Sequence, residues 1–284
     1  MDLSVIDIIL MTCYNYLKVH NTHISSYREQ GEIMDDKLTA IGKTIEILKA
    51  VAKEPYSYSA QELSNALSIN RTTVHRILNE LEQELFVVQN NLNKKYTIGP
   101  SMYHIGSKYL YRNSNFLEIR TIVDNIAVLT KQNIGYTVIE NDKIINLYES
   151  EIAMPVRITY QYGSYFPINR GAYGKTIMAF YKPLEKLEEI VRSSKLEGTT
   201  PNSITDPEEL LLEYKKIREQ GYTISNEENL LGALGIGVPI FNSEGNIHGC
   251  IALAAAKSMM TEEGILFYIG ALKKGAKEIS KYIV

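Results

Sequence analysis

Residues 70–81 carry polar side chains whose types and spacing could bind DNA. One helical stripe is apolar and must pack inward: Val74, Ile77, Leu78 and Leu81. At the N-terminal end the outward side chains are those that bind phosphates and base edges, with no carboxylate among them: Arg71, Thr72, His75, Arg76 and Asn79. This pattern fits a helix whose N-terminus enters the major groove. A solvated amphipathic helix would look the same in isolation, so the neighbouring segments decide.

The segment before this helix predicts the rest of a helix-turn-helix. Apolar residues at helical spacing between Ile41 and Ala52 indicate a first helix, which ends at residues 53–55. Ser59 and Glu62 have the spacing of a capping box, so a short second helix follows. Residues 68–70 then form a tight turn, with Asn70 as the N-cap of the helix over 70–81.

Two short strands are expected after this helix, at residues 86–88 and 95–98. The loop between them contains Asn and Lys and no acid, which suits contact with the phosphate backbone or the minor groove. A helix-turn-helix followed by two strands is a winged helix, predicted here for residues 37–100. Some winged helices bind proteins instead of DNA, and that alternative stays open.

If the winged helix binds DNA, its contacts divide into two groups. Base reading is assigned to Arg71, Thr72, Thr73 and Arg76. Contacts to the DNA backbone are assigned to Ser59, His75, Lys94 and Lys95.

Composition indicates a globular protein of about two domains, since the chain has 284 residues, of which 45% are hydrophobic and 22% charged. The net charge of −3 is unevenly distributed. Residues 37–100 hold eight Lys and Arg against six Asp and Glu, a charge of +2, and the remainder of the chain carries −5. That sign suits a DNA-binding module attached to a domain with another task. The two cysteines, Cys13 and Cys250, lie far apart, which predicts a cytoplasmic protein without a disulfide framework or metal cluster.

Residues 1–36 are expected to be an N-terminal extension, a helix followed by a polar linker. Its apolar run at residues 5–11 is interrupted by Asp7 and has no basic segment before it, so neither a membrane span nor a signal peptide is predicted. The helix would pack on a partner subunit or on the next domain. Cys13, His20 and His23 match no common metal-site spacing.

The rest of the chain reads as a connecting helix over 101–114 and an α+β domain over 115–284. A helix is expected at 116–131, and then strands at 136–139, 144–148 and 156–160, the first two joined as a hairpin. Helices follow at 174–181, at 185–192 and from Asp206 to Gly221; strands at 236–241 and 247–254 come next, and Thr261 caps a last helix. Helices interleaved with a mainly antiparallel sheet suggest a small-molecule pocket of GAF or PAS type.

A catalytic alternative rests on His248 and Cys250, with Glu227 and Glu228 nearby in the sequence. Cys250 lies in an alanine-rich strand, where a buried inert thiol is commoner than a nucleophile. The glycines at 232–237 precede a strand and not a helix, so they form no phosphate-binding loop. Glu227 and Glu228 are expected in a solvated loop, or hydrogen-bonded to backbone near the pocket mouth. The prediction is therefore a protein that is not an enzyme and carries no cofactor or metal.

Residues from about 38 to 283 resemble the IclR family of bacterial transcriptional regulators. Residues 73–78 look like the family's recognition helix. Residues 167–175 are similar to a family segment that usually has His, a small residue and Thr or Ser where this chain has Asn169, Arg170 and Gly171. Residues 221–242 match the family signature, with Gly235 where Ser, Ala or Cys is usual.

The resemblance implies a homodimer or dimer of dimers that binds a palindromic operator in double-stranded DNA and responds to a small-molecule effector, often a carboxylic acid. Repression is the commoner mode in the family. By position, the effector pocket would be lined by Tyr160, Tyr162, Asn169, Arg170, Gly171, Ala172, Ala233, Leu234, Cys250, Ala252 and Ala254.

Arg170 replaces a small family residue, and three roles are open for it. It could bind a carboxylate through two parallel hydrogen bonds, fill the pocket, or point to a surface acid.

Overall fold

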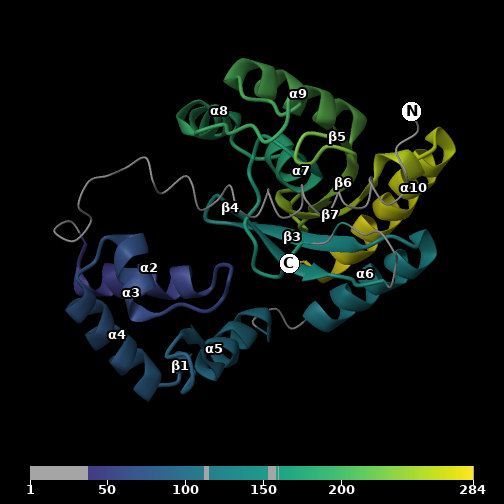
Figure 1. Ribbon diagram of the computed structural model, residues 1–284. Coiled ribbons are helices and arrows are strands. Elements are labelled where there is room, and N and C mark those ends of the chain that lie inside the picture. The colour runs from purple at the N-terminus through teal and green to yellow at the C-terminus, as the bar shows by residue number, and fades with distance from the viewer. Residues whose placement is uncertain (1–37, 112–114, 153–157, 159, 284) are drawn as a thin grey trace, which may run out of the picture. The chain divides into compact units, whose positions relative to one another are not determined.

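The computed structural model describes residues 38–111, 115–152, 158 and 160–283, and the extension predicted at residues 1–36 lies outside them. The chain divides into two compact units, the first ending at Arg112. Figure 1 labels the elements of both units.

The first unit is a winged helix-turn-helix, which confirms the predicted fold of this part of the chain. Its elements are α2 (Ala40–Val51), α3 (Ala60–Leu67), α4 (Arg71–Gln83), β1 (Val87–Gln89), β2 (Tyr96–Ile98) and α5 (Pro100–Tyr111). Strands β1 and β2 pair antiparallel, with Val88 opposite Thr97. A core that includes Leu63, Val74 and Tyr96 joins the helices to this hairpin.

Local capping determines where the helices of this unit begin. The predicted capping box is present, because the Ser59 hydroxyl accepts from the Glu62 backbone N–H while the Glu62 carboxylate accepts from the Ser59 N–H. Asn70 caps α4 by accepting a hydrogen bond of 2.9 Å from the Thr72 N–H. Ser68 ends α3 in the left-handed conformation, and the turn to α4 follows.

The second unit is an α+β domain, as predicted. Its elements are α6 (Phe116–Thr130), β3 (Ile134–Glu140), β4 (Lys143–Glu149), α7 (Ala172–Ala179), α8 (Leu184–Ser193), α9 (Pro207–Gln220), β5 (Thr223–Asn226), β6 (Ala233–Phe241), β7 (Ile247–Ala256) and α10 (Glu262–Ile279). The five strands form one sheet in the order β4-β3-β7-β6-β5, and all neighbours pair antiparallel. A sheet of this kind is compatible with the GAF or PAS type of domain.

Two details differ from the expected strands. Strand β5 was not predicted, since its short polar sequence lacks the alternation that identifies a strand. The strand expected at 156–160 falls mostly outside the described residues, and Ile158 and Tyr160, which are described, are in no strand.

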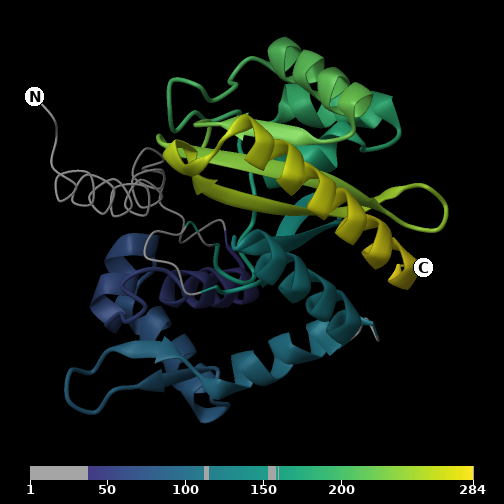
Figure 2. The same ribbon diagram turned by 90° about the vertical axis from the view of Figure 1, so that its right-hand side faces the viewer.

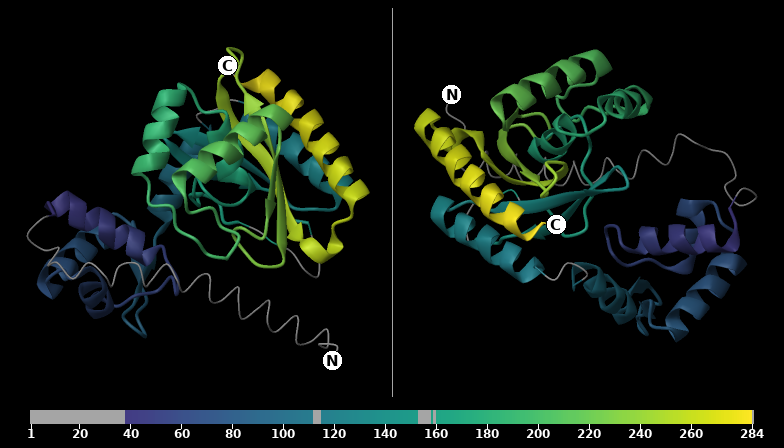
Figure 3. Two further views of the ribbon diagram at one scale, coloured as in Figure 1. Left: turned by 90° about the horizontal axis from the view of Figure 1, so that it is seen from above. Right: turned by 180° about the vertical axis from the view of Figure 1, so that it is seen from behind.

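Helices cover both faces of the sheet (Figures 1 and 3). One core, beneath α6 and α10, contains Ile236 and Leu253. The other core, beneath α7 and α9, contains Ala172, Tyr214 and Cys250. Glycines on this second face let α7 approach the strands closely, because a Cβ on Gly237 would lie 2.3 Å from the Thr176 hydroxyl.

We expect Gly174→Ala to lower the free energy of unfolding of the second unit by about 1–3 kcal/mol, because the added Cβ would lie 1.8 Å from the Pro167 carbonyl oxygen. Gly270→Ala is the matched control: it also lies in a helix of this unit but meets nothing within 4 Å, so it should be neutral or stabilising by up to about 1 kcal/mol. Thermal and urea unfolding measure both, and equal stabilities of the two variants would contradict the close approach of α7 to residue 167.

Candidate nucleic-acid interface and small-molecule pocket

The N-terminal end of α4 presents its polar side chains to solvent. Arg71, Thr72 and Arg76 are exposed, and Thr73 and His75 are half-buried. This orientation follows from the burial of Val74, Ile77 and Leu78 on the opposite side of the helix. The first turn of α4 contains no acid. The Arg76 guanidinium lies 3.5 Å from Glu80, one turn later, in an exposed pair that leaves Arg76 available to a ligand.

Apart from His75 on α4, the residues expected to contact the DNA backbone lie in the wing, which we define as residues 90–95, and at the start of α3. Lys94 is exposed in the wing, whereas the Lys95 ammonium group lies 2.8 Å from the Glu62 carboxylate. The hydrogen bond from Lys95, with those from Ser59, lowers the pKa of Glu62 to about 2. Lys95 would therefore have to leave Glu62 to bind a phosphate. Sequence reasoning missed this pair, which joins residues far apart in the chain.

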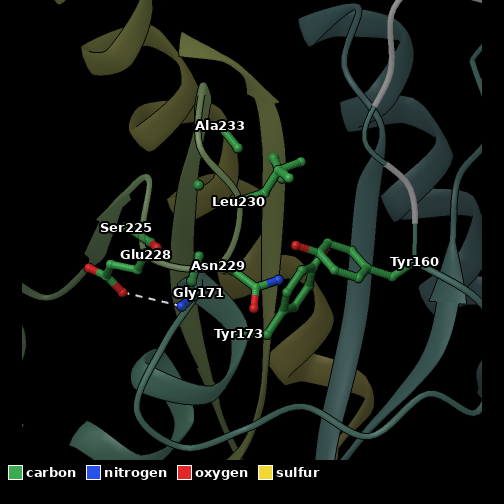
Figure 4. Close-up of a pocket in the computed structure, with 11 residues that line it drawn as sticks. Tyr160, Gly171, Tyr173, Ser225, Glu228, Asn229, Leu230 and Ala233 are labelled. Atoms are coloured by element: carbon green, nitrogen blue, oxygen red, sulfur yellow. Dashed lines mark hydrogen bonds between the residues drawn. The ribbon is translucent and has the colours of Figure 1, made fainter. Parts of the chain in front are cut away.

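A small cavity lies in the second unit between the start of α7, strands β5 and β6, and Tyr160 (Figure 4). Its volume is about 20 Å³, close to that of a single water. The lining residues are Tyr160, Gly171, Ala172, Tyr173, Ser225, Glu228, Asn229, Leu230, Ala233, Gly235 and Ala254. Of the residues expected in an effector pocket, Tyr160, Gly171, Ala172, Ala233 and Ala254 are thus brought together.

The other expected pocket residues do not line this cavity. Leu234 belongs to the core beneath α6 and α10, so its placement was wrong, because successive strand residues face opposite sides of the sheet. Cys250 and Ala252 are fully buried in the core beneath α7 and α9. Tyr162 is 57% exposed, and its hydroxyl donates to the Glu149 carbonyl.

Asn169 and Arg170 instead hold the segment around Glu197. The Asn169 amide donates to the carbonyls of Glu197 and Ile204, at 3.1 and 2.6 Å. The Arg170 guanidinium donates to the Glu197 carbonyl at 2.5 Å and to the Asn229 side chain at 3.1 Å. Arg170 thus fixes Asn229, which itself lines the cavity, and the charge of Glu197 also acts on its guanidinium.

A buried ion pair lies beside the cavity. The Lys175 ammonium group is fully buried, 2.6 Å from the Glu228 carboxylate and 2.8 Å from that of Glu213. The second oxygen of Glu228 accepts from the Gly171 N–H at 3.2 Å, so this carboxylate caps α7, whose N-cap glycine has no side chain. The structure thus places Glu228 on a backbone amide and not in a solvated loop.

A buried carboxyl group, missed in the sequence, lies behind the cavity wall. Glu149 is 3% exposed, with the Tyr173 hydroxyl and the Asn146 amide each 3.4 Å away. Burial raises the pKa of Glu149 to about 8. The Glu149 carboxyl and the Tyr173 ring fit here because residue 135 is glycine, where a Cβ would lie within 2.4 Å of both side chains.

The structure separates the two members of the proposed Cys-His pair. The Cys250 thiol lies on the α7 side of the sheet, and burial raises its pKa well above the ordinary value. His248 hydrogen-bonds at 2.9 Å to the Tyr136 hydroxyl, whose ring belongs to the opposite core. Within the described residues, no group of His, Cys, Asp and Glu side chains is arranged to hold a metal ion. Those residues also include no helix long and apolar enough to cross a membrane.

A winged helix in one unit and an α+β domain with a partly polar cavity in the other define the class of two-domain transcription regulators. The model of the IclR helix-turn-helix domain matches residues 40–91, and that of the bacterial transcriptional regulator IclR C-terminal domain matches residues 108–281. The chain therefore belongs to the IclR family of transcriptional regulators. Because the relatives it matches are regulators, the prediction that it is not an enzyme is confirmed.

Three known proteins illustrate the similarity. The transcriptional regulator KdgR of Dickeya chrysanthemi is 26% identical over 86% of this chain and 80% of its own length. The crystal structure of an IclR regulator from Alicyclobacillus acidocaldarius gives a TM-score of 0.76 at 26% identity, covering 86% of this chain and 98% of that one. An IclR homologue from Microbacterium hydrocarbonoxydans in complex with 4-hydroxybenzoate shares the fold, with a TM-score of 0.71 at 18% identity, covering 86% and 99%.

We expect the stability of the second unit to fall as pH rises from about 4.5 to about 8, because Glu149 is neutral in the folded chain and ionises at lower pH when unfolded. The contribution of Glu149 is complete below pH 4.5 and lost above pH 8, with a slope of up to about 1.4 kcal/mol per pH unit.

Glu149→Gln should remove this dependence and gain stability relative to wild type between pH 5 and pH 9, as urea unfolding at several pH values would show. Glu151→Gln, at an exposed position, is the control. A difference between wild type and Glu149→Gln that stays constant with pH would show that Glu149 is not neutral when folded.

Proposed function

We propose that this regulator binds a palindromic operator in double-stranded DNA through its winged helix, as a homodimer or dimer of dimers, and is switched by a small-molecule effector. One observation carries the proposal: Arg71, Thr72 and Arg76 are exposed together on the N-terminal half of α4, whose first turn contains no acid. This is the surface that a recognition helix needs in the major groove.

Further features of the first unit support contact with DNA. The half-buried Thr73 and His75 lie between the exposed Thr72 and Arg76, and the wing adds the exposed Lys94. Arginine can donate two hydrogen bonds to guanine, whereas lysine and serine suit phosphates. We therefore assign base reading to Arg71, Thr72, Thr73 and Arg76, and backbone contacts to Ser59, His75, Lys94 and Lys95.

Exposed apolar side chains support oligomerisation. On α5, Tyr103 and Ile105 are 82% and 55% exposed, as expected of a helix that pairs with another copy. A single recognition helix reads few base pairs, so two copies related by a two-fold axis read a palindrome whose half-sites are about one DNA turn apart.

The cavity beside α7 supports a small-molecule effector. Its floor consists of small residues such as Ala172, Ala233 and Ala254, while Ser225 and Asn229 supply polar groups. At about 20 Å³ it admits an effector only if its walls move, and this requirement would couple binding to a change of conformation. The Microbacterium homologue with its bound 4-hydroxybenzoate supports the expectation of a carboxylic acid. Such an acid would compete with Asn229 for the Arg170 guanidinium.

We propose that the regulator acts as a repressor.

The alternative is a winged helix that binds a protein instead of DNA. Gel retardation with the promoter next to its own gene separates the two, because absence of retardation even at low salt would refute the DNA-binding proposal.

On the operator so found, Arg76→Ala should relax base preference at one position by about 1–3 kcal/mol, because an arginine that reads a guanine is lost. Lys94→Ala is the contrasting variant. It is expected to weaken binding to all operator sequences equally and to reduce the salt dependence of the affinity. Competition binding with operators changed one base pair at a time measures both. Uniform weakening by Arg76→Ala would remove its assignment as a base reader.

Ala254→Val should weaken effector binding by about tenfold or more, because two added carbons enter the small cavity. Ala256→Val is the matched control, two residues along β7 and outside the cavity lining. Calorimetry with 4-hydroxybenzoate, other small carboxylates and their neutral amides gives the affinities. Equal weakening by both variants would place the effector elsewhere, and tighter binding of the amides would reject the carboxylic acid class.

A further inference from the structure

Leu92 lies in the wing, and its side chain is not packed into the core of the first unit. Its side chain is 95% exposed, more than any other large hydrophobic side chain in the described parts of the chain. Removing a leucine side chain from water is favourable, so an exposed leucine at the end of a hairpin can contribute considerably to binding a partner.

The wing holds Leu92 in an ordered position. The Asn90 side-chain oxygen accepts from the Leu92 N–H at 2.8 Å and from the Asn93 N–H at 3.3 Å. The Asn93 side chain in turn accepts from the Lys95 N–H at 3.0 Å. Lys94 adopts a left-handed conformation with φ of 57°, and its N–H donates to the Asn90 carbonyl. These bonds fix the backbone of the loop, which lies at the end of the β1–β2 hairpin (Figure 2).

The chemistry around Leu92 favours nucleic acid over a protein partner. Its neighbours in the wing are the exposed Asn91, Asn93 and Lys94, so Leu92 is part of no continuous apolar run of the kind that marks protein interfaces. A lone apolar side chain flanked by amides and a cation is instead the combination used in the minor groove. There the apolar group inserts between base pairs, amides bind base edges, and the cation binds phosphate.

We propose that Leu92 inserts into the minor groove beside the major groove read by α4, opening a base step and bending the operator. The inference rests on the proposed DNA-binding function. Asn91 and Asn93 flank the inserted leucine and face the acceptor atoms of A·T pairs. Pyrimidine–purine steps open most easily, so the operator prefers an A·T-rich sequence under the wing, outside the bases contacted by α4.

Leu92→Ala should weaken operator binding by about tenfold and reduce the DNA bend, without changing the salt dependence, because no charge is lost. Leu92→Met keeps a long apolar side chain and should retain most of the affinity. Lys94→Ala is the control with the opposite signature, a reduced salt dependence with the bend retained. Since Leu92 and Lys94 are both exposed, all these variants should unfold at the wild-type temperature.

Base analogues identify the groove. Inosine·cytosine pairs present the minor groove of A·T and the major groove of G·C, whereas true G·C pairs add an amino group to the minor groove. When the base pairs under the wing are changed, the affinity of the wild type should be retained with inosine·cytosine and should fall with G·C. Leu92→Ala should reduce that difference, because Asn91 and Asn93 are then no longer anchored at the opened step. Gel retardation and circular-permutation bending assays on the operator fragment supply both readouts.

The outcomes separate the two proposals. If the wild-type chain binds no DNA at low salt, the proposed function fails and the inference fails with it. If the wild type binds but Leu92→Ala matches it in affinity, bend and A·T preference, DNA binding stands and the minor-groove role of Leu92 is overturned. Loss of affinity without any change in bend or groove preference overturns insertion as well.

Discussion

The buried Lys175–Glu228 ion pair is the constraint on which the second unit depends. A fully buried ammonium group is tolerated only when carboxylates surround it, so α7, which carries Lys175, is fixed to the segment after β5 and to Glu213 on α9. The same Glu228 carboxylate caps α7 at Gly171. The hydroxyl of Ser203 in turn holds the Glu228 carbonyl at 2.6 Å. Because Gly171 and Glu228 both line the cavity, the pair that stabilises this side of the domain also shapes the pocket wall.

The opposite wall of the cavity rests on aromatic packing and on glycine. The ring centroids of Tyr160 and Tyr173 lie 5.4 Å apart, and the Tyr173 hydroxyl reaches the buried Glu149 through the space left at Gly135. A carboxyl group that is neutral when folded can remain among these rings without a cation. The pocket therefore has one ionic wall and one uncharged wall, and an effector that displaces Tyr173 would disturb the environment of Glu149.

Local signals in the sequence predicted most of the fold, because caps and periodicity act within a few residues. Ser59 with Glu62, Asn70 and Asp206 each begin a helix as expected. The pairs that determine the sites were not predictable in this way. Lys95 with Glu62 and Arg170 with Asn229 join distant positions, and no local pattern records them. Strand alternation could have removed Leu234 from the pocket, since it and Ala233 must face opposite sides.

Glu62 links the start of α3 to the wing of the first unit. It caps α3 through Ser59, and it binds Lys95 at the end of the wing. A backbone bridge between Tyr58 and Tyr96 ties the same two segments. This bridge and the shared core hold the helix-turn-helix and the hairpin in one geometry even when Lys95 leaves Glu62, although the loop between the strands is itself exposed. In the proposed DNA complex, α4 and the wing would lie on one rigid body, so that binding by both would cost the rotational and translational freedom only once and their contacts would strengthen each other.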